Sequence, residues 1–267
     1  MNKKEIGFIE KKYNEIMSNS LNPTHLGLLN IFELKKYIKE LVNLDLDVHI
    51  LVIGQNGLSK SYTAMMLSKI LDNNFFKKNN IIYAYHEVSD FIDLIRNKQE
   101  EVIIIDELSV FFGSKLQMTH EQISLFRAFE VARKQKNIYI SCNRDIHDIN
   151  KSYREGKAQI VFFILDRYKE GGNYCAVLIR SPIFQKKDPF DFYSISKASD
   201  LEQFRLYCEL SPAMAGYVFF PHYKEILTED EVQKYEKEKD KGLQDKLKDF
   251  SKQSKKTKNK RGAKNEK

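Results

Sequence analysis

Residues 48–71 restrict the fold of this chain more than any other stretch of the sequence. Six residues, Val-His-Ile-Leu-Val-Ile at 48–53, form a short apolar run rich in β-branched side chains, which is typical of a buried strand. The run ends at Gly54, and the apolar spacing becomes helical over 61–71. The chain therefore has to place a strand, a tight glycine-containing loop and a helix in direct succession.

The loop between strand and helix nearly matches the G-x-x-x-x-G-K-[ST] phosphate loop, or P-loop, although Ser59 replaces its last glycine. In such a loop, backbone N–H groups at a helix N-terminus hold phosphate oxygens. We expect Lys60 to place its charge on the β- and γ-phosphates and Ser61 to ligate Mg²⁺. The residues expected to contact ATP are Gly54, Gln55, Asn56, Gly57, Leu58, Ser59, Lys60, Ser61 and Tyr62. The alternative is an ordinary turn with a solvated lysine.

A second apolar run, residues 101–106, ends in the carboxylates of Asp106 and Glu107. The carboxyl ends of parallel strands line the ligand crevice of an α/β sheet. The pair resembles a Walker B motif with an added catalytic acid. Asp106 is expected to hold Mg²⁺ through water, and Glu107 to polarise the water that attacks the γ-phosphate. The alternative is a solvated strand end.

Strand-like and helix-like segments alternate along the chain. Strands are predicted at 48–53, 81–86, 101–106, 137–142, 159–165 and 174–180, and helices at 1–20, 30–44, 61–71, 89–97, 120–135, 199–208 and after Thr228. Alternation predicts a mainly parallel sheet flanked by helices, and Gly171-Gly172 predicts a turn into a terminal β-hairpin. With the phosphate loop, this indicates an α/β P-loop NTPase of RecA/ASCE type with helical N- and C-terminal extensions.

Four ranges are expected along the chain. They are a helical N-terminal extension at 1–46, a P-loop ATPase core at 47–182, an accessory region at 183–250 that ends in a charged helix, and a disordered basic tail at 251–267. The tail holds eight Lys and Arg residues and one Glu, which accounts for the whole net charge of +7. It can bind any polyanion nonspecifically, or serve only as a solubilising terminus. Alternating Lys and Glu over 231–249 predict an exposed helix.

The three cysteines, Cys142, Cys175 and Cys208, lie among apolar residues and form no C-x-x-C pair, which predicts buried, reduced thiols. The six histidines show no metal-ligand spacing. The sequence shows neither an ordinary signal peptide nor an apolar run of about 18 residues. We therefore expect a cytoplasmic protein with no transmembrane segment.

The segment 129–163 carries a narrower resemblance. Ala132-Arg133 ends a predicted helix, the next strand leads to Asn143, and a loop and a further strand follow. Together with the Walker motifs, this segment resembles the FtsK/HerA-type DNA-pumping ATPases, which include viral genome-packaging and Zot-like assembly ATPases. The resemblance implies a self-associated ring, commonly a hexamer, with DNA in its channel.

The same resemblance assigns roles to two further residues. Asn143 corresponds to the polar sensor at the strand end, where the family commonly has Gln, and would orient water or report on the γ-phosphate. Arg133 is the preferred arginine finger acting on a neighbouring subunit, with Arg144 and Arg154 as alternatives. An Arg at a helix C-terminus also complements the helix dipole, which is the simpler explanation of Arg133.

Two basic loops are candidates for contact with the DNA backbone. They are residues 111–119, with Lys115, and residues 143–157, with Arg144, Lys151, Tyr153, Arg154 and Lys157. Basic side chains beside an aromatic ring suit backbone tracking, although a solvated loop explains the same pattern.

Three functions follow from these motifs. The leading hypothesis is an ATP-hydrolysing motor that translocates or packages DNA, from a virus, plasmid or other mobile element, with a further protein partner. The second is a nucleotide-gated binding or assembly protein with little turnover, which the departures at Ser59 and Asn143 favour. The third is a small-molecule kinase, which Glu107 and the lack of an acceptor-site motif disfavour.

Overall fold

The computed structural model describes residues 28–44, 46–114, 119–167, 172–180, 188–242 and 244. The helix predicted over residues 1–20 and the basic tail lie outside this part. Its helices are α2 (Ile31–Asn43), α3 (Lys60–Leu71), α4 (Val88–Asn97), α5 (Ser109–Phe112), α6 (His120–Ala132), α7 (Lys151–Gly156), α8 (Phe192–Ile195), α9 (Leu201–Leu210) and a last helix over residues 229–242, called the C-terminal helix below. None of the helices described is long and apolar enough to cross a lipid bilayer.

Seven strands form one sheet in the order β2-β3-β4-β1-β5-β6-β7. They are β1 (Val48–Ile53), β2 (Ile81–Ile82), β3 (Val102–Ile105), β4 (Ile138–Asn143), β5 (Ala158–Arg167), β6 (Asn173–Ile179) and β7 (Met214–Phe220). The first five strands pair in parallel, and β6 and β7 continue the sheet antiparallel. β4 lies between β1 and β3, which confirms the predicted α/β fold of RecA/ASCE type.

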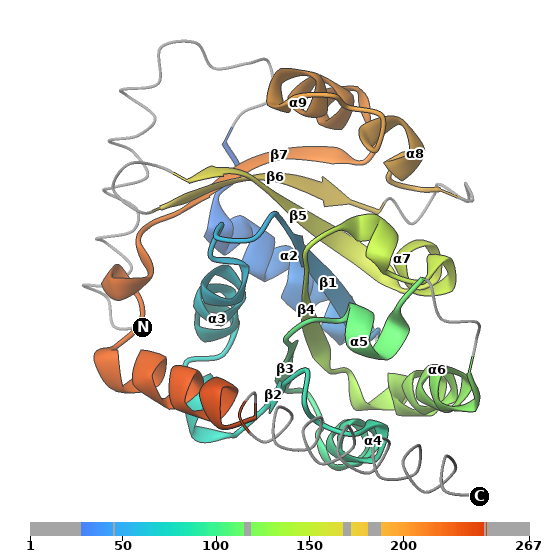
Figure 1. The fold of residues 1–267 in the computed structure, drawn as a ribbon, viewed down its shortest axis with the longest axis vertical. Helices are drawn as coiled ribbons and strands as arrows, with labels where there is room; N and C mark the ends of the chain where they lie inside the picture. Colours follow the sequence, from blue (N-terminus) through green and yellow to red (C-terminus); the bar gives the residue numbers. More distant parts are fainter. Residues whose placement is uncertain are drawn as a thin grey trace, which may run out of the picture.

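Helices cover both faces of the sheet, as Figure 1 shows for α3 and α2 on one side and α4, α6 and α7 on the other. Side chains alternate along each strand, so Ile50 and Val52 belong to the cluster around α2 and α3. Leu51 and Ile53 belong to the cluster around α4 and α6. Because β1 is covered on both faces, all six of its residues are buried, which explains the uninterrupted apolar run.

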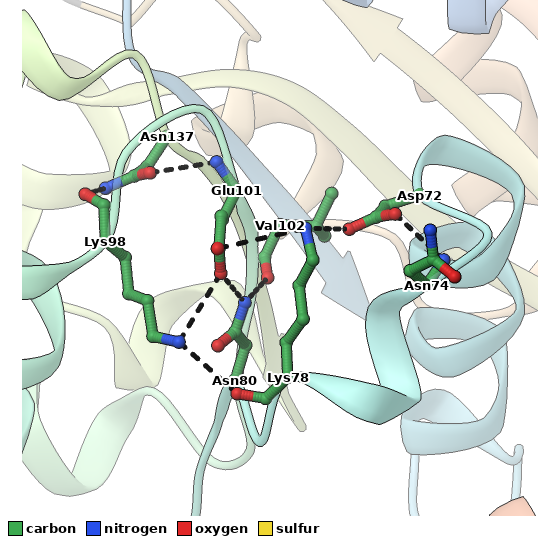
Figure 2. Close-up of polar contacts among 8 residues, drawn as sticks. All are labelled: Asp72, Asn74, Lys78, Asn80, Lys98, Glu101, Val102 and Asn137. Carbon is green, nitrogen blue, oxygen red and sulfur yellow. Dashed lines mark hydrogen bonds and ion pairs between the residues drawn. The ribbon is translucent and has the colours of Figure 1, made fainter.

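Polar side chains join the amino ends of three neighbouring strands (Figure 2). Asn80, Glu101 and Asn137 each come directly before a strand. Asn80 donates to the Glu101 carboxylate and, at 3.0 Å, to the Val102 carbonyl, while the Glu101 N–H donates to Asn137 Oδ1 at 3.1 Å. These bonds tie the three strands together near their amino ends, where Val102 pairs with Ile138. β2 begins two residues later, opposite Ile104, and its last residue Ile82 pairs with Ile105 at the end of β3.

The loop between β1 and α3 contains two residues in the left-handed region, Gly57 with φ 86° and Ser59 with φ 55°. A glycine adopts this conformation readily, whereas Cβ strain opposes it in other residues. Ser59 therefore occupies the glycine position of the phosphate-loop pattern and keeps the glycine-like backbone.

His49 lies in the middle of the buried sheet, where it is fully buried. Its Nε2 is 2.9 Å from Asp47 Oδ2 and its Nδ1 is 2.9 Å from the Tyr153 hydroxyl. Its ring also stacks on Tyr139, with centroids 4.7 Å apart. Both ring nitrogens therefore have partners, as a buried polar group requires.

The structure differs from two sequence predictions and shows one further strand in the accessory region. The strand predicted over 81–86 ends at Ile82, because the chain turns there and the His86 N–H donates to the Tyr83 carbonyl at 3.0 Å. The region 143–157 is not all loop but contains α7. The segment after residue 182 supplies β7 to the same sheet. The division of the chain into the four expected ranges stays a prediction.

Other predictions are confirmed. The β5–β6 hairpin is antiparallel, and all three cysteines are free and buried. Thr228 and Glu231 form the capping box that opens the C-terminal helix, with reciprocal bonds of 2.8 and 3.3 Å.

We predict opposite effects for two substitutions in the phosphate loop. Ser59→Gly should raise the free energy of unfolding by about 0.5–1 kcal/mol because it relieves Cβ strain, and Gly57→Ala should lower it by about 1–2 kcal/mol. Urea denaturation measures both. Gly156→Ala is a matched control, because a Cβ there also meets open space but the backbone carries no left-handed φ. Equal effects of Gly57→Ala and Gly156→Ala would contradict the strain.

We also predict that Tyr153→Phe lowers the free energy of unfolding by about 1–2 kcal/mol, since His49 Nδ1 loses its partner in a buried site. Tyr193→Phe, at a side chain that is 66% exposed, serves as the control. Unchanged stability of Tyr153→Phe in chemical denaturation would show that the bond contributes nothing.

Candidate functional site

The carboxyl ends of β1, β3 and β4 bring the predicted site residues to one edge of the sheet. Ile53 pairs with Asn143, so Gly54 and Asn143 lie side by side, with the Gly54 N–H donating to the Asn143 carbonyl at 3.4 Å. On the other side of β4, Ile105 pairs with Ser141 and leads directly into Asp106. The phosphate loop, the acidic pair and the sensor position therefore face the same crevice.

The first residues of α3 approach the acidic pair most closely. The Ser61 hydroxyl donates to Asp106 Oδ1 at 2.9 Å. A serine hydroxyl and a carboxylate are hard oxygen ligands, and Mg²⁺ needs only one or two such protein groups beside phosphate and water. The residues present therefore fit Mg²⁺, even though the described residues contain no cluster of three His, Cys, Asp or Glu side chains.

Lys60 lies at the start of α3, and its Nζ donates to the Gln55 carbonyl at 3.1 Å across the loop. Partial burial lowers the pKa of its ammonium group, while the neighbouring carboxylates of Glu107 and Asp106 act to raise it. Gln55 and its two successors are exposed. An ammonium group beside exposed backbone at a helix N-terminus can bind a phosphate.

Glu107 and Asn143 are tied together by Ser109. The Ser109 hydroxyl donates to Glu107 Oε1 at 3.0 Å, and the Ser109 N–H donates to Asn143 Oδ1 at 3.0 Å. Glu107 has φ 67°, so the chain turns sharply after Asp106 and aims the two carboxylates differently. The Asn143 amide also donates to the Asp145 carbonyl at 2.6 Å, so its oxygen and its nitrogen each have a protein partner.

The three candidate arginines lie in different places. Arg133 is exposed and precedes β4, at the sheet edge opposite to the phosphate loop, which is roughly 17 Å away along the strand. It therefore lies away from the nucleotide site of its own chain. Arg144 is exposed and follows Asn143 at the same edge as the loop. Arg154 donates to His147 Nδ1 at 2.8 Å and to the Ile146 carbonyl at 3.4 Å.

The expectation for Tyr153 as a nucleic-acid contact is wrong, because its side chain is fully buried and bonded to His49. Arg144 and Lys151 from the same segment are exposed. In the other candidate loop, Lys115 lies outside the described residues.

A cavity of about 580 Å³ adjoins the phosphate loop. Gly54, Gln55 and Leu58 line it on one side, and Arg144 follows from the end of β4. The opposite wall comes from residues 195–204 at the end of α8 and the start of α9. The accessory region, whose role the sequence does not indicate, therefore borders the candidate nucleotide site.

Sequence reasoning missed the contribution of the C-terminal helix. The helix was predicted to be exposed, yet Tyr235 is buried and its hydroxyl donates to Asp106 Oδ2 at 2.9 Å. Lys239 Nζ lies 3.0 Å from the same oxygen. Burial and the adjacent Asp106 carboxylate raise the pKa of Tyr235, so its hydroxyl stays a donor. In the sequence, the burial of this helix face was indicated by a single tyrosine, Tyr235, among Lys and Glu residues.

No known protein family matches the chain, and no curated protein matches it either. Solved structures with a similar fold include the N-terminal domain of zonular occludens toxin from Neisseria meningitidis, at 13% identity and a TM-score of 0.39, covering 56% of this chain and 90% of that chain. The DNA-packaging ATPase B204 from Sulfolobus Turreted Icosahedral Virus is similar at 13% identity and a TM-score of 0.37, with 68% and 95% covered. The genome packaging NTPase B204 from Sulfolobus turreted icosahedral virus 2, in complex with AMP, is similar at 15% identity and a TM-score of 0.33. The match covers 47% of this chain and 78% of that chain. The similar structures thus include both a Zot domain and a genome-packaging ATPase, and at these identities the likeness concerns the fold alone.

Proposed function

We propose that this chain is an ATP-hydrolysing motor that translocates or packages DNA. ATP hydrolysis is supported by the contact between the two Walker motifs. Ser61 Oγ lies 2.9 Å from Asp106 Oδ1. These residues are 45 positions apart in sequence. The strand–loop–helix around Lys60 and the carboxylates after β3 therefore serve one site, as ATP hydrolysis requires.

In this proposal different groups of the chain bind the phosphates, hold the metal ion and accept the proton. The N–H groups of residues 54–61 and the Lys60 ammonium bind the phosphates, and Ser61 and Asp106 would hold Mg²⁺. The ion, when bound, supplies positive charge against the phosphate oxygens. Glu107 accepts a proton from water as the water oxygen attacks the γ-phosphorus and the bond to the β–γ bridging oxygen breaks. Asn143 holds the loop of Glu107 in position through Ser109.

The DNA part of the proposal depends on the family resemblance of residues 129–163 and on charge. Arg144 and Lys151 are exposed, and residues 251–267 carry the net positive charge of the chain. Both suit contact with phosphates rather than with base edges. A ring of subunits would let Arg133 or Arg144 reach the site of a neighbour.

A nucleotide-gated assembly protein with little turnover is the second candidate. Two observations favour it. Asn143 already has protein partners for both its amide oxygen and its amide nitrogen, and Asp106 already binds Tyr235 and Lys239. The contacts of Tyr235 and Lys239 with Asp106 must change before the site can bind Mg²⁺ and turn over.

We predict that purified protein hydrolyses ATP faster with double-stranded DNA than without it. Glu107→Gln should lower the hydrolysis rate about 10²–10⁴-fold while ATP still binds, because only the proton acceptor is removed. Lys60→Ala should weaken ATP binding itself. Phosphate release and nucleotide titration measure the two effects separately.

Two matched variants control this experiment. Glu100→Gln is the control for Glu107→Gln, because it makes the same substitution at an exposed residue just before β3. Lys77→Ala is the control for Lys60→Ala, at an exposed lysine after α3. Both should behave as wild type. ATP binding without hydrolysis under every condition would contradict the motor and favour the assembly protein.

A further inference from the structure

The C-terminal helix lies beside α3 (Figure 1), and its Tyr235 and Lys239 side chains reach Asp106 directly after β3. Polar contacts along its length fix it there. Glu231 pairs with Lys69 of α3 at 2.7 Å, and Glu236 accepts a bond from the Tyr62 hydroxyl at 2.6 Å. Near its far end, Gly242 permits a close approach, because a Cβ there would lie 1.8 Å from the Tyr85 ring.

This placement brings two groups of the helix to Asp106. The Tyr235 hydroxyl donates to Oδ2 at 2.9 Å, and Lys239 Nζ lies 3.0 Å from both that oxygen and the Tyr235 hydroxyl. The other oxygen, Oδ1, accepts the bond from Ser61. Both oxygens of the carboxylate are therefore engaged by the protein itself.

A divalent cation at this site would need Ser61 and Asp106 as its ligands. Ser61 and Asp106 can hold Mg²⁺ only if lone pairs on the carboxylate face the ion or its waters. An ammonium group against the same carboxylate repels the ion, because like charges at this spacing interact strongly at a partly buried site. Lys239 and bound Mg²⁺ therefore exclude each other at Asp106.

We propose that the C-terminal helix closes the metal side of the nucleotide site, with the Lys239 ammonium in the place of the cation until Mg²⁺ and nucleotide displace it. The Lys239 side chain is 46% exposed on a flexible stem, so it can leave the site. Tyr235 is 2% exposed and leaves Asp106 only if the helix shifts. The contact is autoinhibitory, and this inference rests on the proposed nucleotide site.

Binding of ATPγS to the full chain, with saturating Mg²⁺ and separately with EDTA, tests the proposal by calorimetry. Lys239→Met should tighten binding about three- to fivefold with Mg²⁺, since an ion pair of partly exposed groups no longer opposes the cation. With EDTA the same variant should bind less tightly, because the bare polyphosphate loses a nearby positive charge. Lys237→Met, at an exposed lysine of the same helix, is the matched control and should change neither affinity.

The outcomes separate the two proposals. Weaker binding of Lys239→Met with Mg²⁺ would make Lys239 a phosphate ligand and overturn the closure. The closure would also be overturned if Lys239→Met and the wild-type protein had the same ratio of ATPγS affinity with Mg²⁺ to affinity with EDTA. In that case, binding of ATPγS by the wild-type protein would still support the proposed function. Wild-type protein that binds no ATPγS in either condition would remove the proposed function and the closure together.

Discussion

The register of the parallel strands brings their carboxyl ends to one edge of the sheet, and this register positions the candidate site. Asn80, Glu101 and Asn137 bind one another where β2, β3 and β4 begin. The carboxyl ends of β3 and β4 then meet the end of β1 at one edge, where Gly54 continues into the phosphate loop. Because β4 separates β1 from β3, the loop and the acidic pair face each other across one strand width.

The sequence could predict the parts of this arrangement that depend on local pattern. β1 has the predicted bounds because both of its faces are buried and each of its six residues is apolar or, like His49, internally bonded. The glycine-like path at Ser59 also agrees with the motif. The strand predicted to His86 failed because β2 lies at the sheet edge, where apolar residues alone do not keep a strand paired.

Contacts between distant segments could not be predicted in the same way. Tyr153 looked like an aromatic residue in a basic loop, but α7 turns it inward to His49, which is 104 positions away. Tyr235 and Asp106 are 129 positions apart, and the charged pattern around Tyr235 favoured an exposed helix. In both cases one buried tyrosine hydroxyl satisfies a polar group of the sheet, so tertiary packing outweighed the local composition.

In our proposal, Ser61 and Asp106 form the metal site of a nucleotide-binding crevice, and the C-terminal helix closes this crevice. The most direct test is a crystal structure of the protein with ATPγS and Mn²⁺, in which anomalous diffraction locates the ion. We predict an ion peak beside Ser61 Oγ and the Asp106 carboxylate, with Lys239 Nζ out of contact with Asp106. A nucleotide bound away from residues 54–61, or no ion peak at these two side chains, would contradict the proposal.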